Sequence, residues 1–227
     1  MANPAFYVQI ILINDTILFM NCYDFGNKNS SNVLIQHVDE HDLQLIDREV
    51  KILQEMSGDD FHLVAVKIGN WNADLSPWRS PAIFGKEEFG DGAADTLESI
   101  TGMCTDPSKT YYLGGYSLAG LFSLWAAYQT DLFSGIAAAS PSVWFPGFSD
   151  YIKERKILTH AVYLSLGDRE EKTKNPVMRT VGDCIRQTYE SVKDQGIKCT
   201  LEWNEGNHFR DVDIRCAKAF SWVLKNE

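Results

Sequence analysis

Residues 110–121 read TYYLGGYSLAGL, and this stretch decides the fold. Residues 111–113 are typical of a β-strand, whereas the residues from Leu118 onward have the composition of an apolar helix. Between them, residues 115–119 (GYSLA) are a variant of the G-x-S-x-G nucleophile elbow, in which a strand turns sharply into a helix. The small residues on either side of Ser117 let the two backbone segments approach. The turn is predicted to present the Ser117 hydroxyl above a sheet and to leave the Leu118 N–H free to donate to an oxyanion.

Short apolar runs rich in β-branched residues recur along the chain and predict eight strands. They cover 7–13, 16–21, 33–38, 61–68, 110–114, 135–139, 161–166 and 199–203. Asn14-Asp15, between the first two runs, favours a hairpin turn. Helical periodicity covers 43–53 (after Asp42 as N-cap), 118–128, 177–192 and 212–223. This order predicts an α/β fold with a mostly parallel sheet, helices on both faces and functional groups at the carboxyl ends of the strands.

Length and composition place the chain among ordinary globular proteins. It has 227 residues, of which 44% are hydrophobic and 23% charged, and it contains no internal repeat or linker. We therefore predict a single domain over residues 1–227, with no room for a separate cap domain. Acidic residues outnumber basic ones by 31 to 21, which gives a net charge of −10. This balance argues against binding to a nucleic-acid backbone.

Cysteine usage and hydropathy bear on the compartment. The five cysteines are an odd number and include no C-x-x-C pair, which is typical of reduced thiols in a reducing compartment. No apolar run reaches the length of a membrane span. No basic segment precedes the apolar residues 7–13, as it would in a secretion signal. We expect a cytoplasmic protein that acts on a small molecule and not at a membrane.

A serine hydroxyl is a weak nucleophile at neutral pH and needs a base within hydrogen-bond reach. On this type of fold the chain order is serine, acid, histidine, and only His160 and His208 follow Ser117. His160 precedes a predicted strand and therefore lies at its amino end. His208 follows the last predicted strand, at its carboxyl end. We predict that His208 is the general base.

The acid of such a triad should follow the strand 161–166. Three carboxylates compete in the turn after it: Asp168, Glu170 and Glu171. A carboxylate at this place can hold the far ring nitrogen of His208 and stabilise the imidazolium. Spacing alone does not choose among the three, and a solvated charged turn is the alternative.

Four segments of the chain together resemble a known family. They are GGYSLAGLFSLWAAY (114–128), AAASPSVWF (137–145), LSLGDREE (164–171) and EGNHF (205–209). The sequence is similar to the family of α/β-hydrolases that contains esterase D, feruloyl esterases, enterochelin esterases and mycolyltransferases. The A-S-P-S-x-W element discriminates better than the elbow itself, and the resemblance spans residues 33–225. It implies an α/β-hydrolase fold and a catalytic triad.

The resemblance also implies individual site residues. Family members place the acid at the fourth position of a G-x-x-[ED] turn after the seventh strand, which here is Glu170. Their second oxyanion N–H comes from the loop after the third strand, often written D-G, and the matching place here is Val38-Asp39-Glu40, without the glycine. The implied oxyanion hole consists of the backbone amides of Leu118 and Asp39, with the Glu40 amide as an alternative to Asp39.

The segment 69–92 is too long for an ordinary connection, and loops of this length are often functional. Its alternative interpretation is a well-packed surface loop. Trp71 and Trp78 in this segment, together with Trp144 and Tyr116, are predicted to line a substrate pocket. For the three tryptophans, aromatic packing in the core is an equal alternative.

Two further groups of polar residues need an interpretation. Potential metal ligands gather at His37, Asp39, His41 and Asp42. Polar residues are normal in a strand-to-helix loop beside a pocket, so we predict no metal and no cofactor. Ser140 and Ser142 flank Pro141 and are interpreted as turn-forming residues and not as nucleophiles.

The sequence therefore predicts a serine hydrolase that cleaves a small carboxylic ester or thioester through an acyl-enzyme. An acyltransferase that uses the same site, with an alcohol or amine in place of water, is one alternative. A non-catalytic binding module on a hydrolase scaffold is another. The oligomeric state and the identity of the substrate are not predicted.

Overall fold

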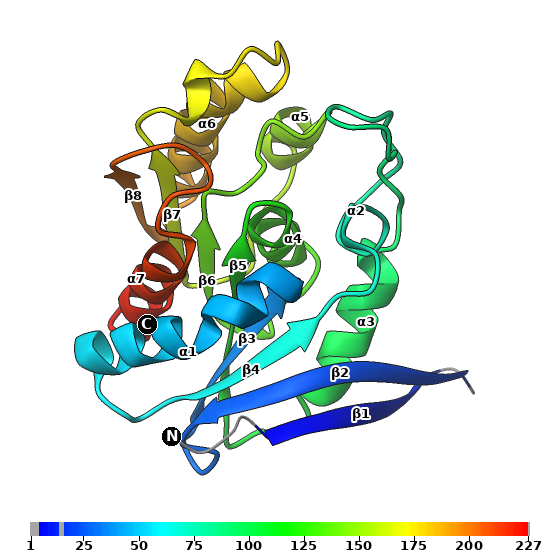
Figure 1. Cartoon of the computed structure of the whole chain (residues 1–227), viewed down its shortest axis with the longest axis vertical. Helices are drawn as coiled ribbons and strands as arrows, with labels where there is room; N and C mark the ends of the chain where they lie inside the picture. The colour runs from blue at the N-terminus through cyan, green and yellow to red at the C-terminus, as the bar shows by residue number, and fades with distance from the viewer. Residues whose placement is uncertain (1–4, 14–15, 227) are drawn as a thin grey trace.

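The computed structural model describes residues 5–13 and 16–226. Their central element is an eight-stranded sheet with the strand order β1-β2-β4-β3-β5-β6-β7-β8. The strands are β1 (Ala5–Ile13), β2 (Thr16–Gly26), β3 (Asn32–Val38), β4 (His62–Lys67), β5 (Thr110–Tyr116), β6 (Phe133–Ala139), β7 (Ala161–Gly167) and β8 (Lys198–Asn204). Strand β2 runs antiparallel to β1 and β4, and the other neighbouring pairs are parallel. Figure 1 shows β1 and β8 at the two edges of the sheet.

The predicted fold class is confirmed. Each of the eight predicted runs forms a strand, and the sheet is mixed but mostly parallel. The predicted turn at Asn14-Asp15 lies outside the described residues. The described residues form no separate cap over the carboxyl ends of the strands.

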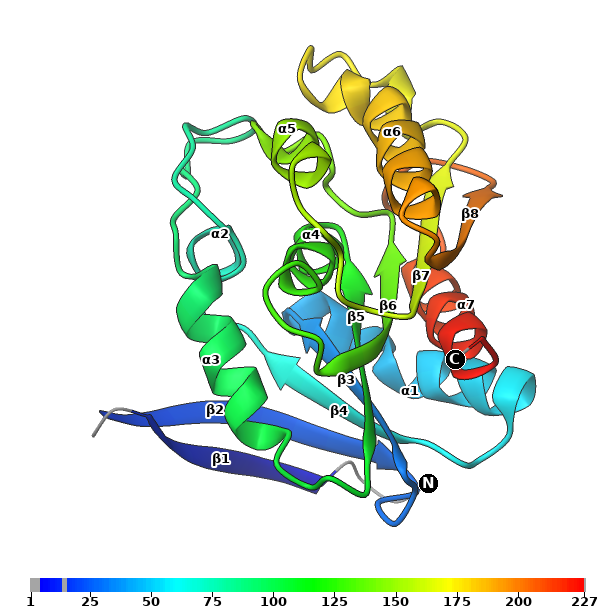
Figure 2. The same ribbon diagram turned by 180° about the vertical axis from the view of Figure 1, so that it is seen from behind.

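Helices cover both faces of the sheet. They are α1 (Glu40–Ser57), α2 (Trp71–Asp74), α3 (Ala93–Met103), α4 (Leu118–Ala126), α5 (Phe148–Lys153), α6 (Val181–Asp194) and α7 (Val212–Leu224), with 3₁₀ turns η1 (Glu170–Lys172) and η2 (Met178–Thr180). Helices α1 and α7 lie in front of the sheet in Figure 1. In Figure 2, seen from behind, α3, α4 and α6 lie in front of it.

The core has two layers, one on each face of the sheet, because successive side chains of a strand alternate between the faces. Leu34 of β3 and Tyr112 of β5 belong to the apolar cluster that includes residues of α1 and α7. Their neighbours Ile35 and Leu113 belong to the cluster that includes residues of α3, α4 and α6. Successive side chains of a strand point to opposite faces, so a sheet buried on both faces reads as a continuous apolar run. This is the pattern from which the strands were predicted.

The start of α1 differs from the prediction. Asp39, not Asp42, is the N-cap residue: its backbone is extended and its Oδ1 accepts a hydrogen bond from the Asp42 N–H at 2.8 Å. The Asp42 carboxylate accepts in return from the Asp39 N–H at 3.3 Å, which completes a capping box. The prediction was wrong because two acidic residues three positions apart can each supply a cap. Which of them does so depends on where the strand ends.

Three helices were not predicted, namely α2, α3 and α5. Helices α2 and α5 are only 4 and 6 residues long, too short to show a periodic apolar face. Helix α3 buries Leu97 and Ile100 but begins at Ala93, directly after the glycine-rich segment 69–92 that obscures its start. That segment is not irregular throughout, because it contains α2 and an isolated bridge between Ser80 and Phe89.

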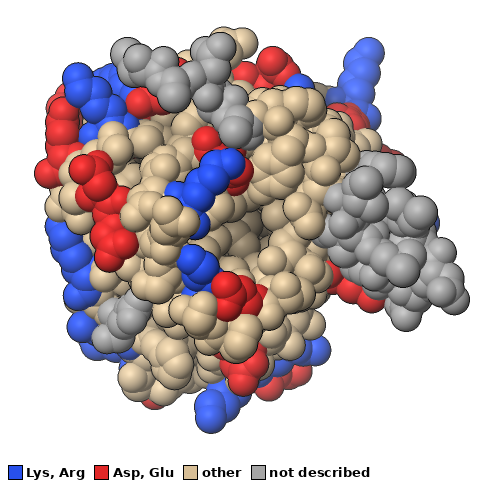
Figure 3. All heavy atoms as spheres, turned by 90° about the horizontal axis from the view of Figure 1, so that it is seen from below, with Lys and Arg blue, Asp and Glu red and all other residues tan. Residues whose placement is uncertain are grey.

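The described part of the chain holds no helix long and apolar enough to cross a bilayer. On the face seen from below, Lys and Arg side chains are interspersed with Asp and Glu (Figure 3). The described side chains on this face therefore form no single-sign patch of the kind that binds a phosphate backbone.

Candidate active site

The chain turns sharply from strand to helix at the junction of β5 and α4, the position of the predicted elbow. Ser117 is the N-cap of α4 and has a backbone φ of 58°, a strained value for a residue with a Cβ atom. Its N–H donates to the Ala139 carbonyl at 3.1 Å, which ties the turn to the end of β6. A Cβ atom at Gly115 would lie 2.6 Å from the Cβ of Ala119. Only glycine fits at this close approach.

Three predicted residues from distant parts of the chain meet at this elbow. His208 Nε2 lies 3.0 Å from Ser117 Oγ, and His208 Nδ1 lies 2.7 Å from Glu170 Oε2. Ser117 follows β5, Glu170 follows β7 and His208 follows β8, so all three lie at the carboxyl ends of parallel strands (Figure 1). In this arrangement a proton on Nδ1 donates to the carboxylate, and Nε2 can accept the serine proton.

The other two candidate acids are turned away from His208. Asp168 Oδ1 accepts a hydrogen bond from the Gly206 N–H at 2.7 Å, so it connects the loop after β7 to the loop that carries His208. Glu171 Oε2 lies 3.6 Å from a guanidinium nitrogen of Arg186, at the surface. Glu170 is therefore the carboxylate that the structure brings to His208.

Both oxygens of Glu170 have fixed partners. Oε2 faces His208, whereas Oε1 accepts from the Gly167 N–H at 2.7 Å, the Ser140 hydroxyl at 2.9 Å and Arg215 Nη1 at 2.8 Å. Burial by itself would raise the pKa of Glu170. The hydrogen bond and charge of His208, followed by the bonds from Gly167 and Ser140, outweigh burial and hold this pKa below its ordinary value. The group is an anion at neutral pH.

Three residues have contacts at the site that were not predicted. Ser140 has a φ of 42° in the turn after β6, and its hydroxyl also reaches Glu170. Ser142 Oγ lies 3.2 Å from Ser117 Oγ. Arg215 is buried on α7. The two serines lie in the A-S-P-S element of the sequence, and Arg215 lies on the buried face of the predicted helix 212–223, which is an unusual place for an arginine.

The structure places the two candidate oxyanion donors differently. The Leu118 N–H is at the first position of α4, where no preceding turn supplies an acceptor, and the helix N-terminus favours negative charge there. The Asp39 N–H already donates to Asp42 within the capping box. An oxyanion would have to compete with that bond, so the Glu40 amide remains the alternative to Asp39.

The capping box also predicts a pH-dependent stability. Burial, followed by the charge of Asp39, raises the pKa of Asp42 from 3.8 to about 6. Between these values the folded state binds more protons than the unfolded state, so the free energy of unfolding falls as the pH rises through this window. We expect the free energy of unfolding of the wild type, taken relative to that of Asp42→Asn, to fall by about 3 kcal/mol across this window and then to stay constant. Urea titrations of both proteins at several pH values measure this free energy. A difference between the two proteins that does not depend on pH would contradict the prediction.

A cavity of about 180 Å³ opens beside the serine and the histidine. It is lined by Asp39, His41, Asp42, Trp71, Tyr116, Ser117, His208, Phe209 and Val212. Two of the predicted pocket residues, Trp71 and Tyr116, are among them. Trp71 is the only contribution that the segment 69–92 makes to this lining.

The other two predicted pocket residues lie in an aromatic cluster away from this cavity. Trp78 donates from Nε1 to the Pro146 carbonyl at 2.8 Å, and its ring contacts Phe145 at a centroid distance of 5.7 Å. The Trp144 ring contacts Phe89 at 6.2 Å. For Trp78 and Trp144 the alternative interpretation, aromatic packing, describes the structure.

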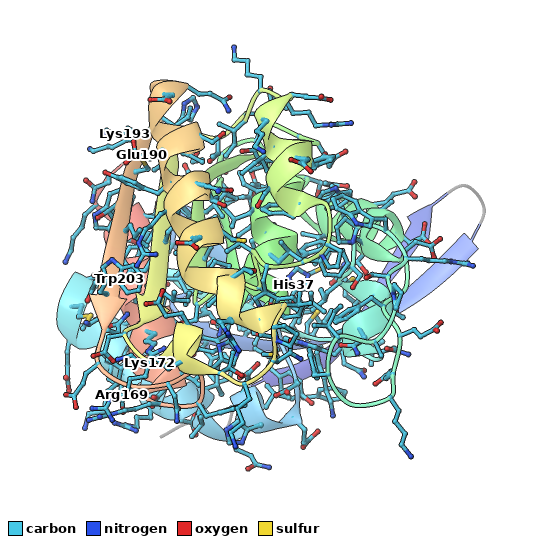
Figure 4. All side chains as sticks on the ribbon, turned by 90° about the horizontal axis from the view of Figure 1, so that it is seen from above. His37, Arg169, Lys172, Glu190, Lys193 and Trp203 are labelled. Carbon is cyan, nitrogen blue, oxygen red and sulfur yellow. The ribbon has the colours of Figure 1, made fainter. Side chains whose placement is uncertain are left out.

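Among the described residues, no group of three or more His, Cys, Asp or Glu side chains is placed to hold a metal ion. His37 is fully buried, and burial lowers its pKa to about 3. Its ring packs against Phe122 at a centroid distance of 4.6 Å, and Figure 4 shows it in the interior, away from the surface residues labelled there. His37 is therefore a neutral core residue, whereas Asp39, His41 and Asp42 line the cavity. The five cysteines are unpaired in the structure.

Comparisons with known proteins place this geometry in a wider context. No family model matches the chain. An uncharacterized protein of Bacillus subtilis strain 168, YbbA, is 22% identical over 180 residues, which cover 71% of this chain and 72% of that protein.

Solved structures give a clearer likeness. An IroE-like serine hydrolase from Shewanella oneidensis has a TM-score of 0.77 at 13% identity, covering 97% of this chain and 80% of that one. The siderophore hydrolase EstA from Aspergillus nidulans has a TM-score of 0.68 at 18% identity, covering 99% and 95%. The enterobactin esterase FES from Shigella flexneri has a TM-score of 0.66 at 11% identity, covering 99% of this chain and 60% of that one. This chain thus has the α/β-hydrolase fold of these serine hydrolases and esterases.

Proposed function

We propose that the protein is a serine esterase that hydrolyses a small carboxylic ester or thioester through an acyl-enzyme. The observation that carries the proposal is the unbroken chain of contacts from Ser117 Oγ through His208 to Glu170, at 3.0 Å and 2.7 Å. The resemblance to esterases in sequence and fold supports the same reaction. The structural neighbours include a serine hydrolase, a siderophore hydrolase and an enterobactin esterase, which is consistent with this reaction.

In the proposed reaction His208 Nε2 takes the Ser117 proton as Oγ attacks the ester carbonyl, and the new C–O bond places a negative charge on the carbonyl oxygen. The Leu118 N–H and a second backbone amide stabilise this oxyanion. When the bond to the leaving group breaks, His208 returns the proton to the departing alcohol. Glu170 keeps the imidazole in the correct tautomer and stabilises its charged form. Water then repeats the two steps and releases the carboxylic acid.

Access of solvent to the base supports water as the acyl acceptor. The His208 side chain is 23% exposed, so a water molecule can reach Nε2 once the alcohol has left. An acyltransferase would need to exclude water from this position. The ratio of acid to transferred product in the presence of added alcohols distinguishes the two reactions.

A fluorophosphonate probe tests the proposal directly, because it reacts with a serine only where a base and an oxyanion hole activate it. We expect stoichiometric labelling, and peptide mapping should place the adduct on Ser117. An ester panel then defines the acyl and alcohol preferences. A folded wild-type protein that takes up no label and hydrolyses no ester would overturn the assignment and leave the binding-module alternative.

Phe209 provides a prediction about substrate preference. Its ring is 86% exposed at the mouth of the cavity and packs edge-on against His208, at a centroid distance of 5.5 Å. An aromatic leaving group can pack on this ring, and such contacts contribute about 1 kcal/mol. We expect Phe209→Ala to raise KM for aromatic esters about 5-fold and to leave KM for ethyl esters unchanged. Phe84→Ala is the matched control, because Phe84 is also exposed but does not line the cavity.

A further inference from the structure

Arg215 is a buried charge that the proposed reaction does not use. It lies on α7 with an exposed fraction of 1%, and it is the largest of the fully buried side chains. Burial of a guanidinium is costly unless the group is paired and hydrogen-bonded. The partners of Arg215 therefore indicate why an arginine occupies this place.

The first set of partners lies on the side of the acid. Arg215 Nη1 donates to Glu170 Oε1 at 2.8 Å, to Ser140 Oγ at 3.0 Å and to the Tyr116 hydroxyl oxygen at 3.0 Å. Tyr116 is the residue directly before Ser117. One nitrogen thus touches the acid, the turn after β6 and the last residue of β5.

The second set of partners lies on the side of the base. Arg215 Nη2 donates to the carbonyls of Glu205 at 3.2 Å and Asn207 at 3.1 Å, which both belong to the loop that carries His208. The Tyr116 hydroxyl donates to the carbonyl of His208 itself at 2.8 Å. The guanidinium therefore joins the loops of the acid and the base.

We propose that Arg215 is a positioning residue of the site, which fixes Glu170 and the His208 loop relative to each other; this inference rests on the proposed esterase function. Because Arg215, Ser140 and Gly167 all donate to Oε1, only Oε2 remains for His208 Nδ1. The hydrogen bonds from Arg215 to the Glu205 and Asn207 carbonyls fix the backbone of the loop that carries His208. Arg215 itself does not touch the reacting atoms and acts through Glu170 and the loop.

The shape of the side chain matters for this role as well as its charge. A guanidinium is planar and presents its donors in a fixed fork, which is how Arg215 reaches five acceptors on four segments. An ammonium group keeps the charge but has three donors on a flexible stem. Arg215→Lys therefore retains the ion pair with Glu170 and loses the anchoring of the loop.

We expect Arg215→Lys to lower kcat about 10- to 100-fold with KM changed less than 2-fold, because a small misplacement of a catalytic group costs up to about 10²-fold. The matched control is Arg186→Lys, which alters an exposed arginine paired with Glu171 and is expected to keep the wild-type kcat. Circular dichroism and the Tm establish that both variants are folded.

A double-mutant cycle separates positioning from general support of the fold. If Arg215 acts through the Glu170–His208 pair, Arg215→Lys slows fluorophosphonate labelling much less in a Glu170→Gln background than in the wild type. Equal effects in both backgrounds would overturn the inference, as would a wild-type kcat for Arg215→Lys.

A second variant keeps the inference testable if Arg215→Lys does not fold. Ser140→Ala removes another donor to Glu170 Oε1 and leaves the ion pair intact. We expect a several-fold lower kcat, again at constant KM, and no further loss in the Glu170→Gln background. The wild-type enzyme distinguishes failure of this inference from failure of the proposed function. If the wild type is active and both variants match it, only the positioning role of Arg215 is wrong, whereas an inactive wild type refutes the esterase proposal.

Discussion

Replacement of Ser117 by alanine is expected to lower kcat for p-nitrophenyl acetate by about 10⁶-fold. The variant keeps the Leu118 amide and the cavity but has no oxygen to form the acyl-enzyme, so only the residual catalysis of the binding site remains. The fold should be unaffected, because serine and alanine accept the backbone φ of 58° equally poorly. Ester hydrolysis assays measure kcat, fluorophosphonate labelling reports on the nucleophile, and the Tm reports on the fold. Activity retained by this variant would contradict the assignment of Ser117.

Two controls belong to this experiment. Ser191→Ala makes the same substitution on α6, far along the chain from the elbow, and should retain full activity and labelling. His208→Ala should be about as slow as Ser117→Ala, and the double variant should be no slower than either, because the serine and its base act as one unit. Additive losses would mean that the two residues act independently.

The parts of the fold that could be predicted are those with a local signal. The elbow needs small residues at fixed positions around Ser117, and the buried strands are apolar because both of their faces are covered. His208 could be singled out because strand direction alone places it at the same edge of the sheet as the serine. These arguments need only neighbours in sequence and the parallel arrangement of the strands.

The parts that could not be predicted depend on side-chain direction or on distant contacts. Asp168, Glu170 and Glu171 lie within four residues, so spacing alone could not choose among them. Only the family resemblance singled out Glu170, and the 3₁₀ turn at η1 is what brings its carboxylate to His208. Trp78 and Trp144 look like pocket residues in sequence but pack against other aromatic rings. Arg215 lies 45 residues from the carboxylate it contacts, and no local pattern indicates such a pair.

Replacement of Glu170 by glutamine is expected to lower kcat by about 10⁴-fold, because the amide imposes the wrong tautomer on His208. Three donors, from Gly167, Ser140 and Arg215, point at Oε1, so the amide oxygen must occupy that place. The amide NH₂ then occupies the place of Oε2 and donates to Nδ1. The imidazole proton moves to Nε2, which can no longer accept the proton of Ser117.

Glu170→Ala tests this argument against the simple loss of a charge. Without the amide, His208 can adopt either tautomer, so we expect this variant to be faster than Glu170→Gln although it lacks the whole side chain. It should also be less stable, by about 3–5 kcal/mol, because the buried charge of Arg215 loses its partner; kinetics are therefore measured well below its Tm. Glu171→Gln, next in sequence and partly exposed, is the matched control and should be fully active. Equal rates for the two Glu170 variants would show that the tautomer is not what the carboxylate controls, and wild-type rates for both would remove Glu170 from the triad.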